Sequence, residues 1–209
     1  MKIETHHQWQ GGITPRVRQV MRMFGVDRAR LARPVEHSID INLEKGDICY
    51  ITGPSGAGKT LLLRKLYEQT AAPKVWLENV PLSRERAVID CIEGTLIESL
   101  RALSRAGLSD VFCVLNQPAN LSDGQKWRYR LARAMTAGAG CIFVDEFCSA
   151  LDRVTAAAIA WNIRKWTAKT NVTAILASCH DDILGDLQPD VLIVKHLSGP
   201  ADIIYRSDT

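Results

Sequence analysis

The chain has 209 residues, a length that fits one domain of ordinary size and leaves no room for a second. Apolar residues make up 46% and charged residues 23%, so the chain can bury a full core and does not have the composition of a disordered protein. Its apolar runs are far shorter than the roughly 20 residues of a membrane-spanning helix, and its first residues lack the apolar core of a signal peptide. We therefore expect a cytoplasmic protein that does not span a bilayer.

The net charge of +3 is unevenly distributed along the chain. Residues 1–34 carry seven Lys or Arg and two acidic residues, a charge of +5, which leaves −2 for residues 35–209. We treat the first segment as a basic N-terminal arm and the second as the main domain. The arm is suited to nucleic acid, an acidic protein or anionic lipid, although a solvated helix face is the more ordinary interpretation. Four apolar residues at helical spacing predict that the arm packs a stripe on the core: Val17, Val20, Met21 and Phe24.

Short apolar segments alternate with helical ones, which is the pattern of a mainly parallel sheet covered by helices. The predicted strands are 39–43, 48–52, 75–80, 87–92, 141–144, 172–177, 191–195 and 202–205. The predicted helices are 60–68, 95–106, 122–137 and 154–167, with a loop-rich piece before the third. The expected fold class is therefore α/β, with a mainly parallel sheet flanked by helices.

The strongest motif is the segment from Gly53 to Thr60, GPSGAGKT, a full match to G-x-x-x-x-G-K-[ST] between a strand and a helix. Glycines permit a tight loop whose amides point at phosphate oxygens, and the helix N-terminus adds positive potential. Lys59 reaches the β- and γ-phosphates, and the Thr60 hydroxyl is a ligand for Mg²⁺. The nucleotide-binding residues predicted here are Gly53, Pro54, Ser55, Gly56, Ala57, Gly58, Lys59, Thr60 and Leu61. The cofactors that follow are ATP and Mg²⁺.

A phosphate-binding loop of this kind needs an acidic residue at the end of a neighbouring apolar strand. The segment Cys141 to Glu146, CIFVDE, supplies one. We expect Asp145 to hold Mg²⁺ through water and Glu146 to be the base that polarises an attacking water. An acidic turn after a strand is common on its own, and it is the combination with the loop that gives it weight.

Residues 121–125 read Leu-Ser-Asp-Gly-Gln and are followed by an arginine-rich segment, 126–135. This pair resembles the signature of ABC-type ATPases, usually written LSGGQ. The other motifs follow in the family's order, with Asp152 in Ser-Ala-Leu-Asp like the D-loop and His180 after a strand like the switch histidine. The resemblance covers about residues 35–195 and implies a P-loop NTPase fold of ABC type that hydrolyses Mg-ATP.

The resemblance also implies a head-to-tail homodimer that sandwiches two ATP molecules between the P-loop of one subunit and the signature of the other. The residues that would contact the partner's nucleotide are Ser122, Asp123, Gly124 and Gln125. Asp152 would reach toward the partner's P-loop. His180 would contact the γ-phosphate and hold the attacking water with Glu146, which together with Lys59 gives the predicted catalytic set.

Two positions depart from the family's pattern. The family places a Gln at the end of the strand after the P-loop helix, where it touches Mg²⁺. Aligning residues 87–90 on that strand puts Asp90 there as a metal ligand, with Gln117 as the rival. The adenine-stacking aromatic is also not identified, and Phe24 is a candidate with His37 behind it.

Only 30 residues separate Asp90 from Leu121, fewer than in transporter ATPases, where this interval builds the helical subdomain that contacts the membrane partner. The chain is most similar to a compact non-transporter branch, known also fused to a predicted acetyltransferase domain. We therefore expect a shortened helical subdomain, with a nucleic acid or protein partner at residues 1–34 and a membrane partner less favoured. The alternatives are an ABC transporter ATPase subunit and a nucleotide-gated dimerising module with little turnover.

Overall fold

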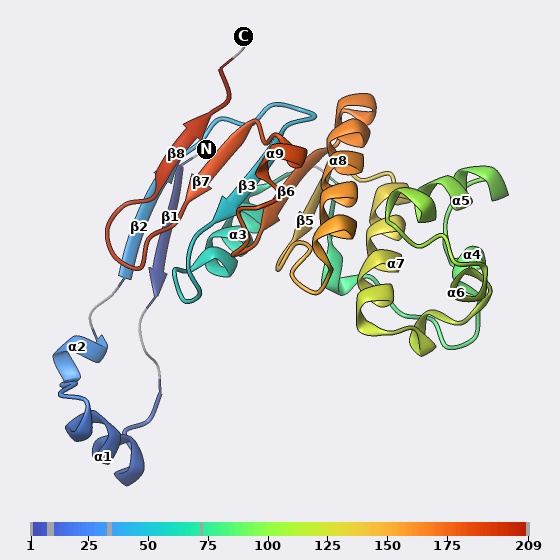
Figure 1. Ribbon diagram of the computed structural model, residues 1–209. Coiled ribbons are helices and arrows are strands. Elements are labelled where there is room, and N and C mark those ends of the chain that lie inside the picture. The colour runs from blue at the N-terminus through green and yellow to red at the C-terminus, as the bar shows by residue number, and fades with distance from the viewer. Residues whose placement is uncertain (1, 8–10, 33–34, 72, 208–209) are drawn as a thin grey trace.

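The computed structural model describes the chain except residues 1, 8–10, 33–34, 72 and 208–209. A six-stranded sheet has the order β4-β5-β6-β3-β7-β8, and its neighbouring strands are parallel except for the antiparallel β7–β8 pair. Its strands are β3 (Ile48–Thr52), β4 (Lys74–Trp76), β5 (Cys141–Val144), β6 (Thr173–Ala177), β7 (Val191–Val194) and β8 (Asp202–Tyr205). This confirms the expected α/β fold (Figure 1).

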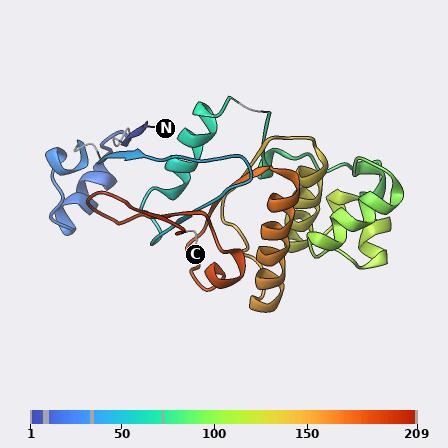
Figure 2. The ribbon, with the colours of Figure 1, turned by 90° about the horizontal axis from the view of Figure 1, so that it is seen from above.

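Strand β3 is the structural centre, and all five of its residues are buried because both faces of the sheet are covered. One face packs against α3 (Lys59–Gln69), in a core that includes Leu62 and Leu63. The other face packs against α8 (Arg153–Thr170) and α9 (Leu184–Leu187). Figure 2 shows α3 and α8 on opposite sides of the strands.

A second, two-stranded sheet pairs β1 (Lys2–His7) with β2 (Val35–Asp40) in antiparallel register. Ile3 lies opposite Ile39, and both are buried in the core on the α3 side. The predicted strand at 39–43 therefore begins earlier and ends at Asp40. Part of the predicted basic arm thus belongs to the folded body, since β1 pairs across the expected boundary at residue 34.

Helices α1 (Pro15–Met23) and α2 (Arg28–Ala32) form an excursion between β1 and β2 that projects away from the sheet (Figure 1). Thr14 caps α1, because its hydroxyl accepts a hydrogen bond from the Val17 amide at 3.2 Å. No residue of α1 is buried, and Phe24, just after it, is 73% exposed. The helix was correctly predicted, but the prediction that its apolar stripe packs on the core is wrong.

A small helical subdomain lies beyond β5 and consists of short elements followed by one long helix (Figure 1). Its members are η1 (Leu77–Asn79), α4 (Val88–Cys91), α5 (Leu96–Arg105), α6 (Val111–Leu115), η2 (Pro118–Asn120) and α7 (Asp123–Thr136). The expected strand at 87–92 is wrong, since Val88, Cys91 and Ile92 are spaced as on a helix and α4 packs against α5 and α6. None of the described helices is long and apolar enough to cross a membrane.

Candidate functional site

The loop between β3 and α3 is built around glycines with positive φ angles. Gly53 has φ +136°, and a Cβ atom at this position would lie 2.1 Å from the carbonyl oxygen of Lys195. That close approach arises because the chain after β7 runs beside the loop, with the Lys195 amide donating to the Thr52 carbonyl at 2.8 Å. Gly56 and Gly58 have φ +81° and +85°. The backbone path of the motif therefore requires glycine at its first position.

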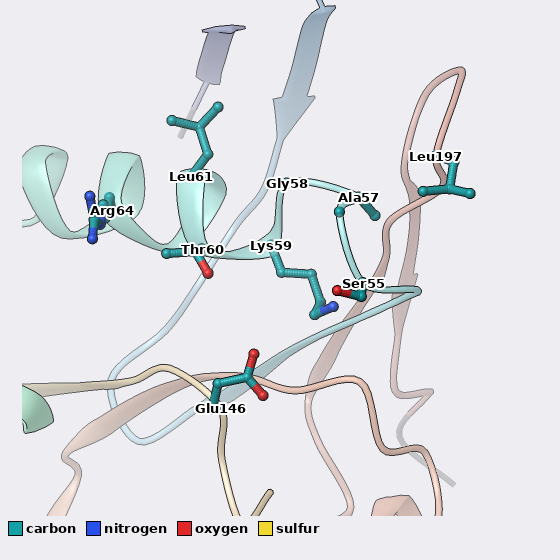
Figure 3. Close-up of a pocket in the computed structure, with 10 residues that line it drawn as sticks. Ser55, Ala57, Gly58, Lys59, Thr60, Leu61, Arg64, Glu146 and Leu197 are labelled. Carbon is teal, nitrogen blue, oxygen red and sulfur yellow. The ribbon is translucent and has the colours of Figure 1, made fainter. Parts of the chain in front are cut away.

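This loop forms one wall of a cleft of about 560 Å³, shown in Figure 3. The lining residues are Ser55, Gly56, Ala57, Gly58, Lys59, Thr60, Leu61, Arg64, Glu146 and Leu197. All but the last two come from the predicted nucleotide-binding loop and the start of α3. Leu197, on the loop between β7 and β8, was not predicted because an exposed leucine in a loop carries no pattern in the sequence.

Lys59 is buried within the loop, with only 7% of its surface exposed. Its ammonium group donates hydrogen bonds to the carbonyl oxygens of Gly53 at 2.8 Å and Pro54 at 3.0 Å. These bonds compensate the burial of the charge. Arg64 adds a second cation to the cleft wall, one turn further along α3. The cleft is therefore a positively charged hollow at a helix N-terminus, which favours an anion.

Glu146 reaches the cleft from the opposite side, and its carboxylate points toward Lys59 (Figure 3). Its backbone is left-handed, with φ +48°, an unfavourable conformation for a residue with a side chain. Both the amide and the hydroxyl of Ser149 donate to the Glu146 carbonyl, at 3.1 and 2.9 Å, and hold this turn. The local strain is thus offset by the turn, and the result is a carboxylate aimed into the cleft.

Asp145 directly follows β5, as predicted, but β5 is not the direct neighbour of β3. Strand β6 lies between them, so the expectation of a neighbouring strand is wrong by one position. The side chain of Asp145 is half-buried and accepts a hydrogen bond from the Glu146 amide at 3.1 Å. It is not one of the residues lining the cleft.

Glu78 is a carboxylate that the sequence analysis missed. The β4–β5 register pairs Trp76 with Phe143, and Glu78 follows two residues later in the short helix η1. Partial burial raises the pKa of Glu78, and the negative charge of Asp145 raises it further. The residue was hidden because the predicted strand ran to Val80, whereas β4 ends before it. The carboxylates of Glu78 and Asp145 and the hydroxyl of Thr60 are oxygen donors of the kind that Mg²⁺ prefers.

Asp90, predicted as a metal ligand, lies on α4 in the helical subdomain and is exposed. The strand that was to carry it is absent, so the basis for this assignment is wrong. The rival Gln117 precedes η2, where its side-chain oxygen accepts from the Asn120 amide group at 3.2 Å. Neither residue lines the cleft. The adenine-stacking candidate Phe24 lies on the projecting excursion, and the side chain of His37 falls outside the described residues.

The signature-like segment begins α7 through a reciprocal cap. The Ser122 hydroxyl accepts from the Gln125 amide at 3.4 Å, and the Gln125 side chain accepts from the Ser122 amide at 2.9 Å. Asp123 is exposed, and Gly124 lies near Leu151, since an added Cβ would meet that side chain at 3.7 Å. The Ser122 hydroxyl therefore already accepts one hydrogen bond within its own chain, and among the described residues its proton has no acceptor.

Asp152 is the N-cap of α8, accepting from the Thr155 amide at 3.0 Å and the Thr155 hydroxyl at 2.6 Å. These hydrogen bonds lower the pKa of its carboxyl group. His180 follows β6 and has an exposed side chain outside the lining of the cleft. The structure thus brings Lys59, Thr60 and Glu146 together in one chain, and it leaves the signature, Asp152 and His180 outside that cleft.

A parallel sheet with a glycine-rich phosphate loop at the carboxyl end of its central strand defines a P-loop nucleotide-binding protein. A family model described as "AAA domain" matches residues 42–184. The aliphatic sulfonates import ATP-binding protein SsuB 2 of Pseudomonas fluorescens is 30% identical, with 81% of this chain and 69% of that protein covered. The chain belongs to the P-loop family of ABC-type ATPases.

The chain is also similar to the methionine import ATP-binding protein MetN of Mannheimia succiniciproducens, with 27% identity over 86% of this chain and 61% of that protein. It therefore spans less than two thirds of the length of MetN. Among solved structures, an ATP-binding cassette described as a dimer in a post-hydrolysis state bound to ADP and Pi has a TM-score of 0.64. That match has 17% identity and covers 84% of this chain and 94% of the cassette, which confirms the fold.

Proposed function

We propose that the protein binds and hydrolyses Mg-ATP. The observation that supports this most directly is the cleft in which Lys59 and Glu146 face each other across the space between the loop and the turn after β5. Lys59 and the loop amides would bind the phosphates, and Glu146 would accept a proton from the attacking water. Hydrogen bonds fix the Lys59 ammonium group and the turn that carries the Glu146 carboxylate, so catalysis would depend on positioning and charge stabilisation.

The donor set fits Mg²⁺, although the cation itself is outside what the structure shows. Thr60 and Asp145 would hold it, and the carboxylate of Glu78 would take the place that we first assigned to Asp90. When bound, the cation would neutralise charge on the phosphate oxygens. Burial raises the pKa of Glu78 most and the charge of Asp145 adds to it, and a divalent cation between the two carboxylates would offset their repulsion.

The active unit in our proposal is an ATP-dependent head-to-tail homodimer. The cleft is lined only by the P-loop side and by two other residues, Glu146 and Leu197, while the signature segment starts α7 in the helical subdomain. Ser122 and its neighbours would therefore meet the nucleotide of a second copy, and Asp152 would reach toward the P-loop of that copy. His180 would contact the γ-phosphate and hold the attacking water with Glu146. The dimeric cassette among the solved structures is consistent with this arrangement.

Glu146→Gln is the variant that tests the activity. It removes the base while keeping size and hydrogen-bonding groups, so we expect ATP turnover to fall at least about 100-fold while ATP binding persists. The variant should elute as a dimer with ATP and as a smaller species with ADP in size exclusion with light scattering. Glu85→Gln, in an exposed turn, is the matched control and should behave as wild type. Unchanged turnover in Glu146→Gln would refute the assignment.

The work that ATP drives is a separate question, and the relatives favour a transporter subunit over the non-transporter branch that we first expected. Both MetN and SsuB 2 are described as import ATP-binding proteins. The helical subdomain also displays two triads of exposed large apolar side chains at i, i+1 and i+4 spacing: Leu96, Ile97 and Leu100 on α5, and Val111, Phe112 and Leu115 on α6. Exposed apolar groups of this size indicate a protein docking surface.

Substituting Ile97 and Phe112 by Ser tests this coupling surface. If a membrane protein is the partner, Glu146→Gln protein should co-purify with it from detergent-solubilised membranes in ATP, and the double substitution should abolish the capture without changing basal turnover. Recovery in the absence of membranes, with no dependence on the two side chains, would instead support the non-transporter branch, which is the one known also fused to an acetyltransferase domain.

The excursion at residues 11–32 supports a second partner proposal within residues 1–34, a nucleic acid or an acidic protein. Its described part carries arginines at 16, 18, 22, 28 and 30 against a single acid, Asp27. Replacing Arg18 and Arg22 by Ser should weaken binding to DNA or RNA and reduce its salt dependence. Binding that is insensitive to salt, or unchanged by the two substitutions, would count against this partner.

A further inference from the structure

Two hydroxyl groups lie on one face of the otherwise apolar strand β3. Tyr50 and Thr52 are two residues apart, so their side chains point to the same side of the sheet. Tyr50 is 0% and Thr52 4% exposed. The residues between and beside them are Cys49 and Ile51, which belong to the core on the other face. A buried hydroxyl requires a hydrogen-bond partner, and here both partners are found in one segment.

That segment is the turn after β6, which contains His180. The Tyr50 hydroxyl donates to the His180 carbonyl oxygen at 2.5 Å. The Thr52 hydroxyl donates to the carboxylate of Asp181. A third bond comes from the backbone, since the Ser178 amide donates to the Ile51 carbonyl at 3.0 Å. Three consecutive residues of β3 thus hold residues 178–181.

The side chain of His180 itself takes no part in these bonds. The hydrogen bonds of this residue are made by its backbone: the carbonyl accepts from Tyr50, and the amide donates to the Ser178 hydroxyl at 3.3 Å. The imidazole is exposed and left to act elsewhere. On the other side, Asp182 forms an ion pair with Arg153 at the start of α8. The backbone of the segment is therefore fixed at both ends while the imidazole is available.

We propose that Tyr50 and Thr52 are positioning residues for His180, which they hold through its carbonyl oxygen and through the carboxylate of Asp181. The inference rests on the proposed hydrolysis, in which His180 contacts the γ-phosphate. Strand β3 leads directly into Gly53, so one rigid strand sets the place of both the phosphate loop and the histidine. Burial raises the pKa of the Tyr50 phenol, so its hydroxyl stays a donor over the whole working pH range.

Tyr50→Phe is the first test, because it removes the hydroxyl and keeps the buried ring. We expect kcat for ATP to fall about three- to tenfold, the range expected for one hydrogen bond, with KM and ATP affinity unchanged. In a His180→Ala background the same substitution should have no further effect on kcat. Tyr205→Phe is the matched control. Tyr205 lies on β8, away from the cleft, and its hydroxyl accepts from the Asn42 amide at 3.1 Å. In this variant kcat should stay at the wild-type value.

Thr52→Val and Thr52→Ser extend the test at the second contact. The valine variant keeps the shape and loses the hydroxyl, and it should lower kcat like Tyr50→Phe, whereas the serine variant should restore it. Wild-type kcat in both Tyr50→Phe and Thr52→Val would overturn the proposal. So would an equal loss in the His180→Ala background, because the effect would then not pass through the histidine.

Hydrogen–deuterium exchange gives a readout that does not depend on hydrolysis. Peptides covering residues 178–184 should exchange faster in Tyr50→Phe and Thr52→Val, while peptides of α8 should be unchanged. Faster exchange in a protein that has no ATPase activity would refute the proposed function but not the positioning of residues 178–181 by Tyr50 and Thr52. Unchanged exchange in an active protein would refute this positioning role alone.

Discussion

Lys195 gives a sharp physical prediction, because it is a charged side chain in an apolar place. It follows β7, and its residue surface is only 1% exposed. Among the described residues its ammonium group has no ion-pair or hydrogen-bond partner. Burial lowers the pKa of Lys195 to about 8, from the usual 10.5. The folded protein therefore disfavours the charged form, and replacement by an apolar residue of similar length should stabilise it.

The size of the effect follows from the pKa difference. A lysine pKa that is lower in the folded than in the unfolded protein destabilises the fold in full at pH values below the folded-state pKa. This destabilisation disappears as the pH rises toward the unfolded-state pKa. The shift corresponds to at most about 3 kcal/mol at pH 7, and to about 1 kcal/mol near pH 9.5. Lys195→Met should therefore be more stable than wild type by up to those amounts, so its advantage should shrink by about 2 kcal/mol over this interval.

Urea denaturation of both proteins under reducing conditions, at the two pH values, measures this difference. Wild type must be compared with Lys195→Met at each pH. Burial raises the pKa of the thiols of Cys49, Cys141 and Cys148, so ionisation of these thiols in the unfolded chain also lowers the stability of both proteins as the pH rises. Those contributions cancel between wild type and variant. Lys45→Met, in an exposed turn, is the control. An advantage that is absent at pH 7, or constant with pH, would refute the reasoning.

Three further substitutions have clear outcomes. Gly53→Ala should abolish ATP binding and lower the free energy of unfolding by at least about 2 kcal/mol, because its Cβ would meet the Lys195 carbonyl, while Gly185→Ala in open space should be neutral. Asp190→Asn should cost about 1–3 kcal/mol in urea denaturation, since the carboxylate binds two arginines and a backbone amide at 2.6 to 2.8 Å. Lys74→Met should lower the free energy of unfolding by about 1 kcal/mol, measured as a modest fall in melting temperature, since its ammonium binds carbonyl groups at the end of α3.

The parts of the fold that were predicted well are those with long, unambiguous patterns. The buried strands β3, β5 and β6 and the long helices α7 and α8 were all expected close to their observed bounds. Within the helical subdomain α5 and α7 were also expected, but residues 87–92 form α4 instead of a strand, and the helix α6 was not expected. Short apolar stretches have the same composition in a strand and in a single helical turn. The choice depends on whether a neighbouring strand is available, which the local sequence does not contain.

The same distinction applies to the candidate site. The P-loop and the acidic strand end could be predicted because their residues are adjacent in sequence and their chemistry needs that spacing. Glu78 could not, because it becomes relevant only when the fold places η1, which follows β4, close enough to Asp145 for the two charges to interact. The assignment of Asp90 failed for the corresponding reason, since it depended on a strand that is a helix. Contacts that depend on which strands are neighbours can be predicted only when the strand order of the sheet is known, and that order is determined by the whole chain.

Strand β3 shows what could be predicted from the sequence beyond the P-loop motif itself. Its residues, Ile-Cys-Tyr-Ile-Thr, precede the P-loop directly, and a central strand of a parallel sheet is buried on both faces. Two hydroxyl groups in such a strand must each find a partner. Thr52 lies at its carboxyl end, where the loops of neighbouring strands meet, and Tyr50 lies two residues before it on the same face. A contact with a functional loop therefore follows from the sequence. That this loop contains His180 requires the structure, because only the β3–β6 pairing places residues 178–181 beside these hydroxyls.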